Sequence, residues 1–422
     1  MKKVIVLVLN LAMVFAVGTV LTSCGGSGGE GESDQAMKVG LICLHDENSG
    51  YDLNFINGFK EACKDEGIEY QIKTNIPEDQ QAYEAAAELA DAGCGIVFAD
   101  SYGHQPYIIQ AATDFPGVQF VSCTGDRAKT EGLDNFHNAF ATIYEGRYLA
   151  GVAAGMKLNE MIEKGDITAD QAKMGYVGAL TYAEVISGYT SFYLGARSIC
   201  PDVTMEVTFT GSWLNETAEK EAANKLIDNG CVLISQHADS MGAPTACEKA
   251  GVPDVSYNGS TQEACPNTYI ISSRINWTPF YKYAIEGMQN DGKFDTDWCG
   301  TRETGSVLLT EPNEKVAAEG TAEKIKEVTA KLDSGEIKVF DTSIFTVSTI
   351  DPKKFINTTA KTDSEGHLTS YMADVEYDES FAGDTEAVKD GFFHESEFRS
   401  APYFNVQIDG IKLLDTKFES ID

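Results

Sequence analysis

The pattern of the whole chain is set by Lys38-Val-Gly-Leu-Ile-Cys-Leu44, His45-Asp-Glu-Asn-Ser-Gly-Tyr-Asp52 and the segment that continues to Asp65. A short apolar run bounded by polar residues is typical of a buried strand, and the segment after it is typical of an amphipathic helix. The same alternation continues along the chain. It predicts an α/β fold with parallel sheets that helices cover on both faces.

The first series of alternating segments ends near residue 143. In it we expect strands at Lys38–Leu44, Tyr70–Lys73, Gly95–Phe98 and Val118–Ser122, and helices at about Tyr51–Asp65, Asp79–Ala92 and Gln105–Asp114. A second series follows a long helix predicted over Glu145–Ile162. It has strands at Met174–Val177, Thr204–Thr208, Val232–Gln236, Asp254–Tyr257 and Tyr269–Ser272, and helices at Ala183–Ile199, Glu216–Asn229, Met241–Ala250 and Pro279–Gln289.

Two similar series predict two Rossmann-like lobes with parallel sheets, joined by a hinge. We place the N-terminal lobe at 37–143, with later strands returning to it from about 270–345, and the C-terminal lobe at 144–269. Beyond them, Glu314–Leu332 is predicted to be helical and Glu336–Thr346 to be a strand. Residues 346–422 are predicted to form an appendage packed on one lobe.

The N-terminus has the pattern of a bacterial lipoprotein. Lys2 and Lys3 precede an apolar stretch, which Leu21-Thr22-Ser23-Cys24 closes. Residues 1–23 are therefore predicted to be a signal peptide and Cys24 the lipidated residue, and residues 24–36 read as a Gly/Ser-rich flexible tether. An ordinary signal peptide with an incidental cysteine is the alternative. The expected location is extracytoplasmic, with a lipid on Cys24 anchoring the protein to the cell membrane.

The composition excludes several classes of function. The 422 residues carry 32 Lys and Arg against 65 Asp and Glu, a net charge of −33, so the surface repels phosphate backbones and nucleic acid is not an expected partner. Ten cysteines show no C-x-x-C spacing, and six histidines show no H-E-x-x-H motif. We therefore expect buried thiols, no metal, no cofactor and no catalytic residue set, although one or two disulfides stay open as an alternative.

Polar and aromatic residues follow the ends of the predicted strands, where open α/β sheets bind their ligands. Rings stack on a planar ligand, while amide and carboxyl groups can hydrogen-bond its edges. For Tyr51, Asp239 and the tryptophans the alternatives are helix capping or core packing. The candidate ligand-binding residues are Asn48, Tyr51, Asp52, Ser101, Tyr102, Trp213, His237, Asp239, Asn258 and Trp277.

Several of these segments resemble the basic membrane protein (BMP) family, the purine nucleoside-binding lipoproteins of bacterial ABC importers. The resemblance runs from about Lys38 to Thr346, with separate motifs in order, and it implies a fold like that of type 1 periplasmic binding proteins. The similar motifs are Asn48-Ser-Gly-Tyr51, Tyr144-Glu-Gly-Arg-Tyr-Leu-Ala-Gly-Val-Ala-Ala-Gly155, Met174-Gly-Tyr-Val-Gly178, Gly188-Tyr-Thr-Ser-Phe-Tyr-Leu-Gly-Ala-Arg197, Gly211-Ser-Trp213 and Gln236-His-Ala-Asp-Ser240.

The resemblance implies roles for single residues. Tyr51 takes the place of the family's base-stacking aromatic residue, whereas Asn48 and Thr124 stand where members have aspartates. Asn258 stands near the family's ribose-binding aspartate, and Asn276 with Trp277 falls near its ribose-binding lysine. Because these charged groups are lost, a free purine base or another flat heterocycle such as a flavin competes with a nucleoside as the expected ligand.

The sequence therefore predicts the substrate-binding protein of an ABC transporter, which captures a purine nucleoside or purine base between two lobes and delivers it to permease subunits. Riboflavin as the ligand, or a role as a ligand sensor for a membrane receptor, is the alternative. A nucleoside hydrolase would need clustered aspartates that hold calcium near a ribose, and the strand ends carry asparagine and tryptophan instead.

Overall fold

The computed structural model describes residues 37–348, 359–375 and 383–417, which belong to one compact unit. The predicted signal peptide, the tether and Cys24 lie outside these residues. Among the helices of the described part, none is long and apolar enough to cross a membrane.

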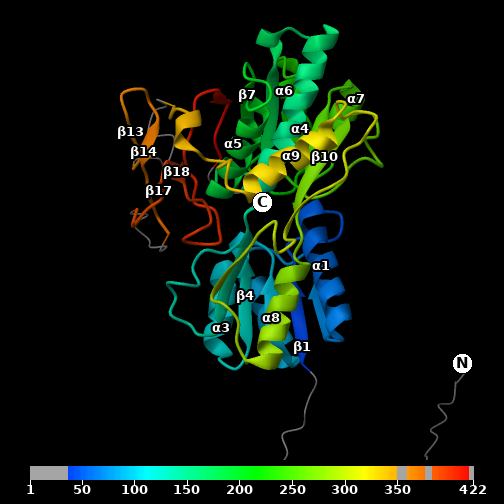
Figure 1. Cartoon of the computed structure of the whole chain (residues 1–422). Helices are drawn as coiled ribbons and strands as arrows, with labels where there is room; N and C mark the ends of the chain where they lie inside the picture. Colours follow the sequence, from blue (N-terminus) through cyan, green and yellow to red (C-terminus); the bar gives the residue numbers. More distant parts are fainter. Residues whose placement is uncertain (1–36, 349–358, 376–382, 418–422) are drawn as a thin grey trace, which may run out of the picture. The chain divides into compact units, whose positions relative to one another are not determined.

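The first lobe is built on a six-stranded sheet in which every neighbouring pair is parallel (Figure 1). Its strand order is β11-β5-β4-β3-β1-β2. The strands are β1 (Lys38–Ile42), β2 (Glu69–Lys73), β3 (Cys94–Ala99), β4 (Gln119–Cys123), β5 (Phe136–Ala141) and β11 (Asp297–Gly300), and the helices are α1 (Gly50–Glu66), α2 (Gln80–Asp91), α3 (Gln105–Asp114) and α8 (Thr278–Asn290).

Side-chain alternation along the strands of this sheet creates a core on each face. In β3, Ile96 and Phe98 belong to the cluster with α1 and α8, whereas Val97 and Ala99 belong to the cluster with α2 and α3. A strand buried on both faces is apolar throughout, and this explains the continuous hydrophobic run that the sequence shows there.

The second lobe is built on a seven-stranded sheet with the order β12-β10-β9-β8-β6-β7-β19. All pairs are parallel except β10 with β12. The strands are β6 (Lys173–Gly178), β7 (Thr204–Phe209), β8 (Leu233–Gln236), β9 (Asp254–Tyr257), β10 (Tyr269–Ile275), β12 (Val307–Leu309) and β19 (Ile411–Leu413), and the helices are α4 (Ile143–Lys164), α5 (Ala183–Arg197), α6 (Glu216–Asp228), α7 (Gly242–Ala250) and α9 (Thr321–Asp333).

Helices α4 and α5 pack against each other at very short range because both carry glycine at the contact. A Cβ atom added at Gly151 would stand 2.0 Å from the carbonyl oxygen of Phe192, and one at Gly195 would stand 2.0 Å from that of Tyr148. The small-residue run in the long helix therefore serves close helix packing.

The chain passes between the lobes at three places in the described residues: after β5, after β10 and after β11. The expectation that strands after about residue 270 return to the N-terminal lobe holds for β11 alone. It is wrong for β12, which pairs antiparallel with β10, while β10 pairs with β9 in the second sheet, where the second series places it. Helix α8 packs on α1 in the first lobe.

The predicted strand over Glu336–Thr346 is also wrong, since this segment contains a short 3-10 helix, η3 (Thr342–Ile344), and no strand. Helix α9 starts seven residues later than predicted, at Thr321 instead of Glu314. Two further 3-10 turns, η1 (Tyr102–His104) and η2 (Ala169–Gln171), complete the helical elements of the described residues.

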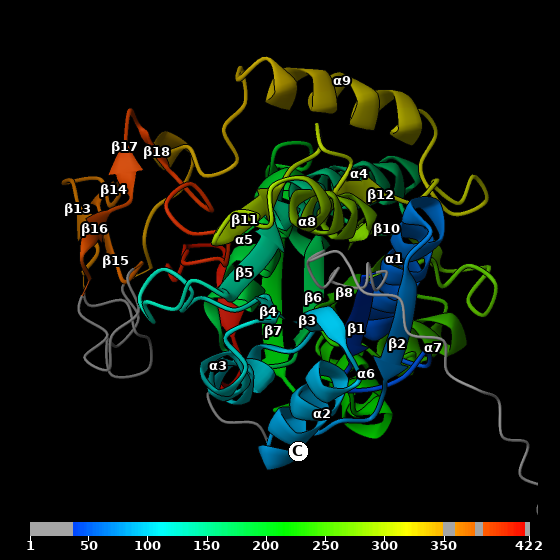
Figure 2. The same cartoon turned by 90° about the horizontal axis from the view of Figure 1, so that it is seen from below.

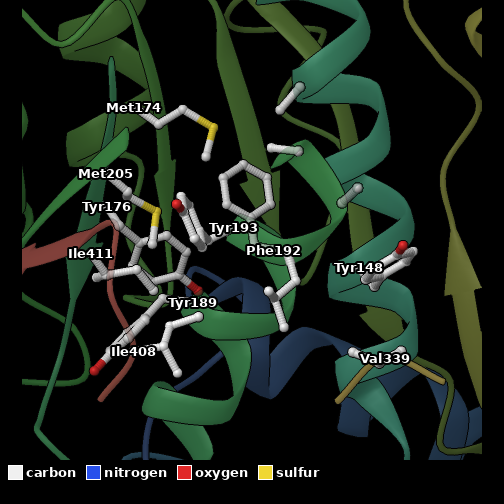
Figure 3. Packing of buried hydrophobic residues seen from close by; sticks show 14 of the residues in the cluster. Tyr148, Met174, Tyr176, Tyr189, Phe192, Tyr193, Met205, Val339, Ile408 and Ile411 are labelled. Atoms are coloured by element: carbon white, nitrogen blue, oxygen red, sulfur yellow. The ribbon is translucent and has the colours of Figure 1, made fainter. Parts of the chain in front are cut away.

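The C-terminal residues are more than an appendage, because they complete the second sheet. Strand β19 pairs in parallel with β7, and Ile408 and Ile411 enter the same apolar cluster as Met205 and Tyr189 (Figure 3). The remaining strands form three two-stranded pairs beside this lobe (Figure 2): β13 (Lys361–Thr362) with β14 (Leu368–Ser370), β15 (Met372–Ala373) with β16 (Thr385–Glu386), and β17 (Val388–Lys389) with β18 (Phe392–Phe393).

The nine cysteines in the described residues are all free thiols, and eight of them are buried. The prediction of buried thiols is confirmed, and the alternative of disulfides finds no support among these residues.

Candidate functional site

A narrow cavity lies where the strand ends of the two lobes face each other; it has about 400 Å³ of empty space, open solvent included, of which only about 20 Å³ admits the centre of a water molecule. Loops after β1, β3 and β4 supply one wall, while α5 and the loops after β7 and β8 supply the other. It is lined by Leu44, His45, Tyr51, Ser101, Tyr102, Thr124, Glu184, Trp213, His237 and Asp239.

The first-lobe wall is held by the start of α1. Ser49 caps this helix by accepting a hydrogen bond from the backbone N–H of Asp52, 3.2 Å away. Tyr51, on the first turn, donates its hydroxyl hydrogen to the carbonyl oxygen of Asp100 at 2.6 Å. Burial raises the pKa of Tyr51 well above its usual value, and the nearby Glu184 carboxylate acts in the same direction. The ring is therefore a fixed, neutral surface.

The second-lobe wall carries Trp213, in the loop after β7. Its ring centroid lies 5.9 Å from that of Tyr182, which in turn lies 5.9 Å from that of Tyr102 in the first lobe. Tyr51 and Trp213 line the same cavity from opposite lobes. The arrangement offers aromatic surface on both sides of the space between the lobes.

Acidic and histidine side chains occupy the rest of the second-lobe wall. His237 Nε2 lies 3.3 Å from Glu184 Oε1, and Asp239 Oδ1 accepts a hydrogen bond of 3.0 Å from Asn258 Nδ2. Burial raises the pKa of Asp239 well above its usual value, and the neighbouring carboxylates, first Asp52, add to the rise. Burial lowers the pKa of His237, so the imidazole is held neutral.

The lining of this cavity contains no lysine or arginine. Glu184 faces it without a lysine or arginine in the lining, so the site disfavours phosphates and carboxylates and suits neutral or cationic ligands. A protonated Asp239 both donates and accepts hydrogen bonds, which fits the mixed donor and acceptor edge of a heterocycle.

A second cavity, with about 1160 Å³ of empty space, adjoins the first and shares Asp239 with it. Asn48 and Asn258 line this second cavity instead of the first, together with other carboxamides and one arginine. The half-buried Arg274 has Glu61 near it, and burial lowers its pKa. The wall is thus polar and hydrogen-bonding, in contrast to the aromatic first cavity.

Trp277 does not line either cavity, so its predicted place in the ligand site is wrong. Only 1% of it is exposed, and its ring stacks on Phe55 with centroids 4.2 Å apart. Phe55 in turn lies 4.9 Å from the ring of Tyr51. The sequence motif placed Trp277 at a lobe crossing, where its apolar ring turns inward between α1 and α8 and not toward the gap.

Asp52 also lines neither cavity. Its carboxylate makes hydrogen bonds inside the first lobe instead. Its Oδ1 accepts a hydrogen bond of 2.8 Å from the backbone N–H of His45. Although burial alone would raise it, hydrogen bonds from His45 and Ser49 lower the pKa of Asp52. Asp52 therefore supports the loop that carries the cavity residues.

Asp52, Asp100 and the thiol of Cys43 form a buried cluster whose donor atoms lie within 4.8 Å of one another. Burial, and then the charge of Asp52, raise the pKa of Asp100 well above its usual value. Asp100 thus keeps its proton while Asp52 is ionised, so that one proton serves the pair.

Four residues of the cavity lining were not among the candidate ligand-binding residues: Leu44, His45, Thr124 and the acidic Glu184. Glu184 is the one with a side-chain carboxylate. It stands on the first turn of α5. The signal that could have found it is its position directly after β6, at the same sheet edge as the other strand-end residues.

Two lobes built on largely parallel sheets, with a cavity lined by both of them, are the arrangement of solute-binding proteins. The family model described as "ABC transporter substrate-binding protein PnrA-like" (Bmp) matches residues 44–343, and the chain belongs to this family. The predicted resemblance and fold class are confirmed.

The similar proteins are named as binding proteins, but their names give different ligands. A purine-binding protein of Brucella abortus is 29% identical over 320 residues, which cover 74% of this chain and 85% of that protein. A Haloferax volcanii protein named for glucose binding in an ABC transporter is 31% identical over 61% of this chain, and the match spans 62% of that protein. A solute-binding protein of an ABC transporter system from Aeropyrum pernix has a similar fold, with a TM-score of 0.60, 18% identity and coverage of 75% of this chain and 95% of that one.

Proposed function

We propose that this protein is the lipid-anchored substrate-binding component of an ABC importer, which closes on a purine nucleoside or purine base and delivers it to permease subunits. The observation that carries the proposal is the pair Tyr51 and Trp213, which line one cavity from opposite lobes. A planar guest between such rings gains about 0.5–1.5 kcal/mol per ring pair beyond simple burial.

The hydrogen-bonding groups around the cavity support a purine edge. Asp239, with its raised pKa, can donate a proton to a ring nitrogen and accept from a ring N–H or an exocyclic amine. Ser101 and Thr124 add hydroxyl groups on the first-lobe wall. A sugar has no ring face of this kind, and therefore the aromatic walls favour a base over glucose.

The charge of the lining supports an unphosphorylated ligand. A nucleotide would place its phosphate beside Glu184 without a lysine or arginine in that cavity to neutralise it. The adjoining polar cavity begins at Asp239 and has room for the sugar of a nucleoside or for the side chain of riboflavin. Riboflavin is for that reason the second candidate.

The test is isothermal titration of the soluble body, beginning at Gly25, with adenosine, guanosine, inosine, hypoxanthine, riboflavin and D-glucose. We expect saturable binding of at least one purine, and Trp213→Ala should weaken it by about tenfold or more. Trp298→Phe, on β11 and outside the cavity lining, is the matched control. Absence of binding by every purine, or glucose binding alone, would overturn the purine assignment.

The anchor is tested separately. The wild-type chain produced in bacteria with radiolabelled palmitate should carry the label and sediment with membranes, whereas Cys24→Ala should do neither. An unlabelled wild-type protein in the membrane-free fraction would contradict the lipid anchor and leave the ligand assignment standing.

A further inference from the structure

The last described residues, 383–417, form what we call the C-terminal arm, and by its core the arm belongs to the second lobe. Phe404, Val406 and Ile408 are fully buried in the apolar cluster around α4 and α5. Gln407 accepts a hydrogen bond of 2.9 Å from the Tyr189 hydroxyl, and β19 extends the sheet. The arm therefore moves with the second lobe.

The same arm contacts the first lobe through three consecutive residues, Phe398, Arg399 and Ser400. Ser400 donates its backbone N–H to Asp297 Oδ2 in β11 at 2.9 Å, and Lys129 Nζ donates to the Phe398 carbonyl oxygen at 2.6 Å. Arg399 Nη1 lies 3.9 Å from Asp126 Oδ2, in the loop after β4. These contacts bridge the two lobes outside the segments where the chain itself crosses.

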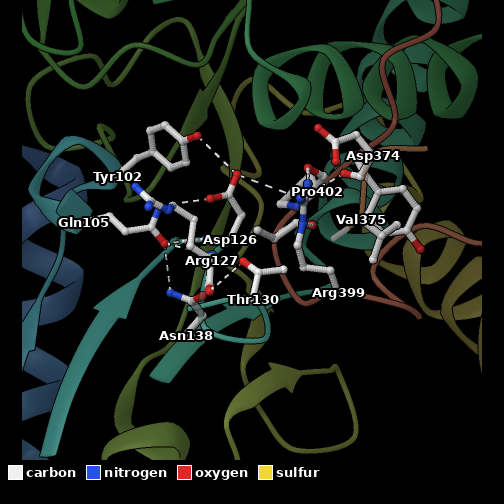
Figure 4. A network of polar contacts seen from close by, with 12 residues as sticks. Tyr102, Gln105, Asp126, Arg127, Thr130, Asn138, Asp374, Val375, Arg399 and Pro402 are labelled. Carbon is white, nitrogen blue, oxygen red and sulfur yellow. Dashed lines mark hydrogen bonds and ion pairs between the residues drawn. The ribbon is translucent and has the colours of Figure 1, made fainter. Parts of the chain in front are cut away.

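The guanidinium of Arg399 is held in place by contacts other than the one with Asp126. It donates to the carbonyl oxygens of Asp374 at 3.1 Å, Ala401 at 3.3 Å and Pro402 at 3.1 Å (Figure 4). The side chains of Arg399 and Asp126 are 8% and 10% exposed. Little water screens an ion pair this deeply buried, and removing one partner leaves the other charge buried without its counter-ion.

Asp126 connects this ion pair to the ligand cavity. The oxygen that faces Arg399, Oδ2, also accepts a hydrogen bond of 3.2 Å from the hydroxyl of Tyr102, which lines the cavity (Figure 4). Its other oxygen accepts from Gln105 Nε2 at 2.9 Å. A single carboxylate thus contacts a cavity residue of the first lobe and a cation that the second lobe carries.

We propose that the C-terminal arm is an interlobe clamp: Arg399 holds the closed arrangement of the lobes and positions Tyr102 at the ligand through Asp126. Residues 383–417 lie beyond the family match, which ends at residue 343, so the clamp is a property of this chain and not of the family pattern. The positioning of Tyr102 at a ligand rests on the proposed function, whereas the clamp itself does not.

The physical consequence is a shift in the equilibrium between open and closed lobes. Opening separates Arg399 from Asp126, and both are then left with fewer partners unless water enters. The clamp therefore favours the closed form even when no ligand is bound. A bound ligand can leave only after this contact has broken. Removing it should raise the dissociation rate more than it changes the association rate.

The first test uses the protein without ligand, so that it does not depend on the purine assignment. Arg399→Gln and Lys129→Met are compared with wild type by small-angle X-ray scattering and by hydrogen exchange of the amides at 398–401. Lys412→Gln is the matched control, because Lys412 is a cation on the same arm that pairs with Glu206 inside the second lobe, at 3.0 Å. We expect a larger radius of gyration and faster exchange in the first two variants and not in the control.

The second test measures ligand dissociation by stopped-flow fluorescence with inosine and hypoxanthine as probes. Arg399→Gln and Asp126→Asn should each raise the dissociation rate by about tenfold. The double variant should be no faster than either single one, because both act on one contact. Additive effects would assign Arg399 a general structural role and refute the positioning of Tyr102.

The outcomes separate the two proposals. If wild type binds none of the purines in the titrations described above, the purine assignment fails, and the scattering and exchange data still decide the clamp. If Lys129→Met and Arg399→Gln match Lys412→Gln in both ligand-free measurements, the clamp is refuted, whatever the protein binds. Because Lys129 also pairs at 3.0 Å with the nearly buried Asp297 inside the first lobe, thermal melting first checks that Lys129→Met is folded.

Discussion

Replacing Trp277 by alanine should damage the fold and spare the ligand site. The ring is 99% buried, stacks on Phe55 at 4.2 Å and meets Phe280 edge-on at 6.3 Å. An alanine there leaves a cavity between α1 and α8 that the surrounding helices fill only in part.

The expected loss is about 3–5 kcal/mol of unfolding free energy, the range for a fully buried tryptophan or phenylalanine cut to alanine. For a domain of this size about 1 kcal/mol corresponds to roughly 2–4 °C, so the melting temperature should fall by about 6–20 °C. The affinity for a purine, measured well below the transition, should change by less than about threefold because the ring does not line the cavity.

Differential scanning calorimetry and urea titration measure the first quantity, and isothermal titration at a low temperature measures the second. Trp213→Ala is the reciprocal variant, with a small loss of stability and a large loss of affinity, since this half-buried ring lines the cavity. A Trp277→Ala protein with unchanged melting and abolished binding would refute the distinction between the two tryptophans.

Three further predictions follow from single features. Burial raises the pKa of Asp254 to about 7, so the stability that its protonated form contributes is lost as the pH rises through about 7; the unfolding free energy of Asp254→Asn, from urea titration, should therefore fall less between about pH 5 and pH 8 than that of wild type, and equal slopes would contradict the shift. Gly151→Ala should lower the melting temperature markedly in calorimetry, because its Cβ would collide with the Phe192 carbonyl oxygen, whereas Gly117→Ala, which meets open space, should not. Adenosine 5′-monophosphate should bind at least about a hundredfold more weakly than adenosine in isothermal titration, and equal affinities would contradict the acidic lining around Glu184 and Asp239.

Most of the helices and strands follow from the hydrophobic pattern. The predicted bounds of the strand at Asp254–Tyr257 and the helix at Gln105–Asp114 agree with β9 and α3, because apolar period and flanking turn residues point the same way there. Strand β5 was not predicted. Its sequence, Phe-His-Asn-Ala-Phe-Ala, buries His137 and Asn138, whose side chains find partners only in the folded sheet.

The lobe to which a strand belongs depends on the strand it pairs with in the folded protein. The hydrophobic periodicity of the sequence does not give this partner. Strands β10, of seven residues, and β11, of four, are both partly apolar, yet β10 pairs with β9 and β11 with β5. The sequence also gives no sign that β19 returns to β7, more than 200 residues away, since Ile411–Leu413 is only three residues long. Whether a distant segment pairs with the edge strand of a sheet depends on the space beside that strand, and the local hydrophobic pattern does not describe this space.

The candidate site divides in the same way between local and long-range causes. Tyr51 is placed by the cap at Ser49 and by the position of α1 after β1, both of which the sequence displays. Trp277 also follows a strand, but its aromatic neighbours Phe55 and Phe280 come from two helices and remove it from the gap. A residue beyond a strand end thus contacts a ligand only where apolar side chains of the core do not pack around it.

The contacts from Tyr102 through Asp126 to Arg399 connect a residue that the local sequence pattern predicts with one that it does not. Tyr102 stands at a strand end that the pattern predicts, whereas Arg399 lies in a segment whose role no local pattern reveals. Because one carboxylate oxygen serves both, any motion of the lobes that moves Arg399 also changes the partners of Tyr102. Ligand affinity in this protein therefore depends on a contact outside the cavity, and substitutions in the arm should change the lifetime of the complex while every residue that lines the cavity stays in place.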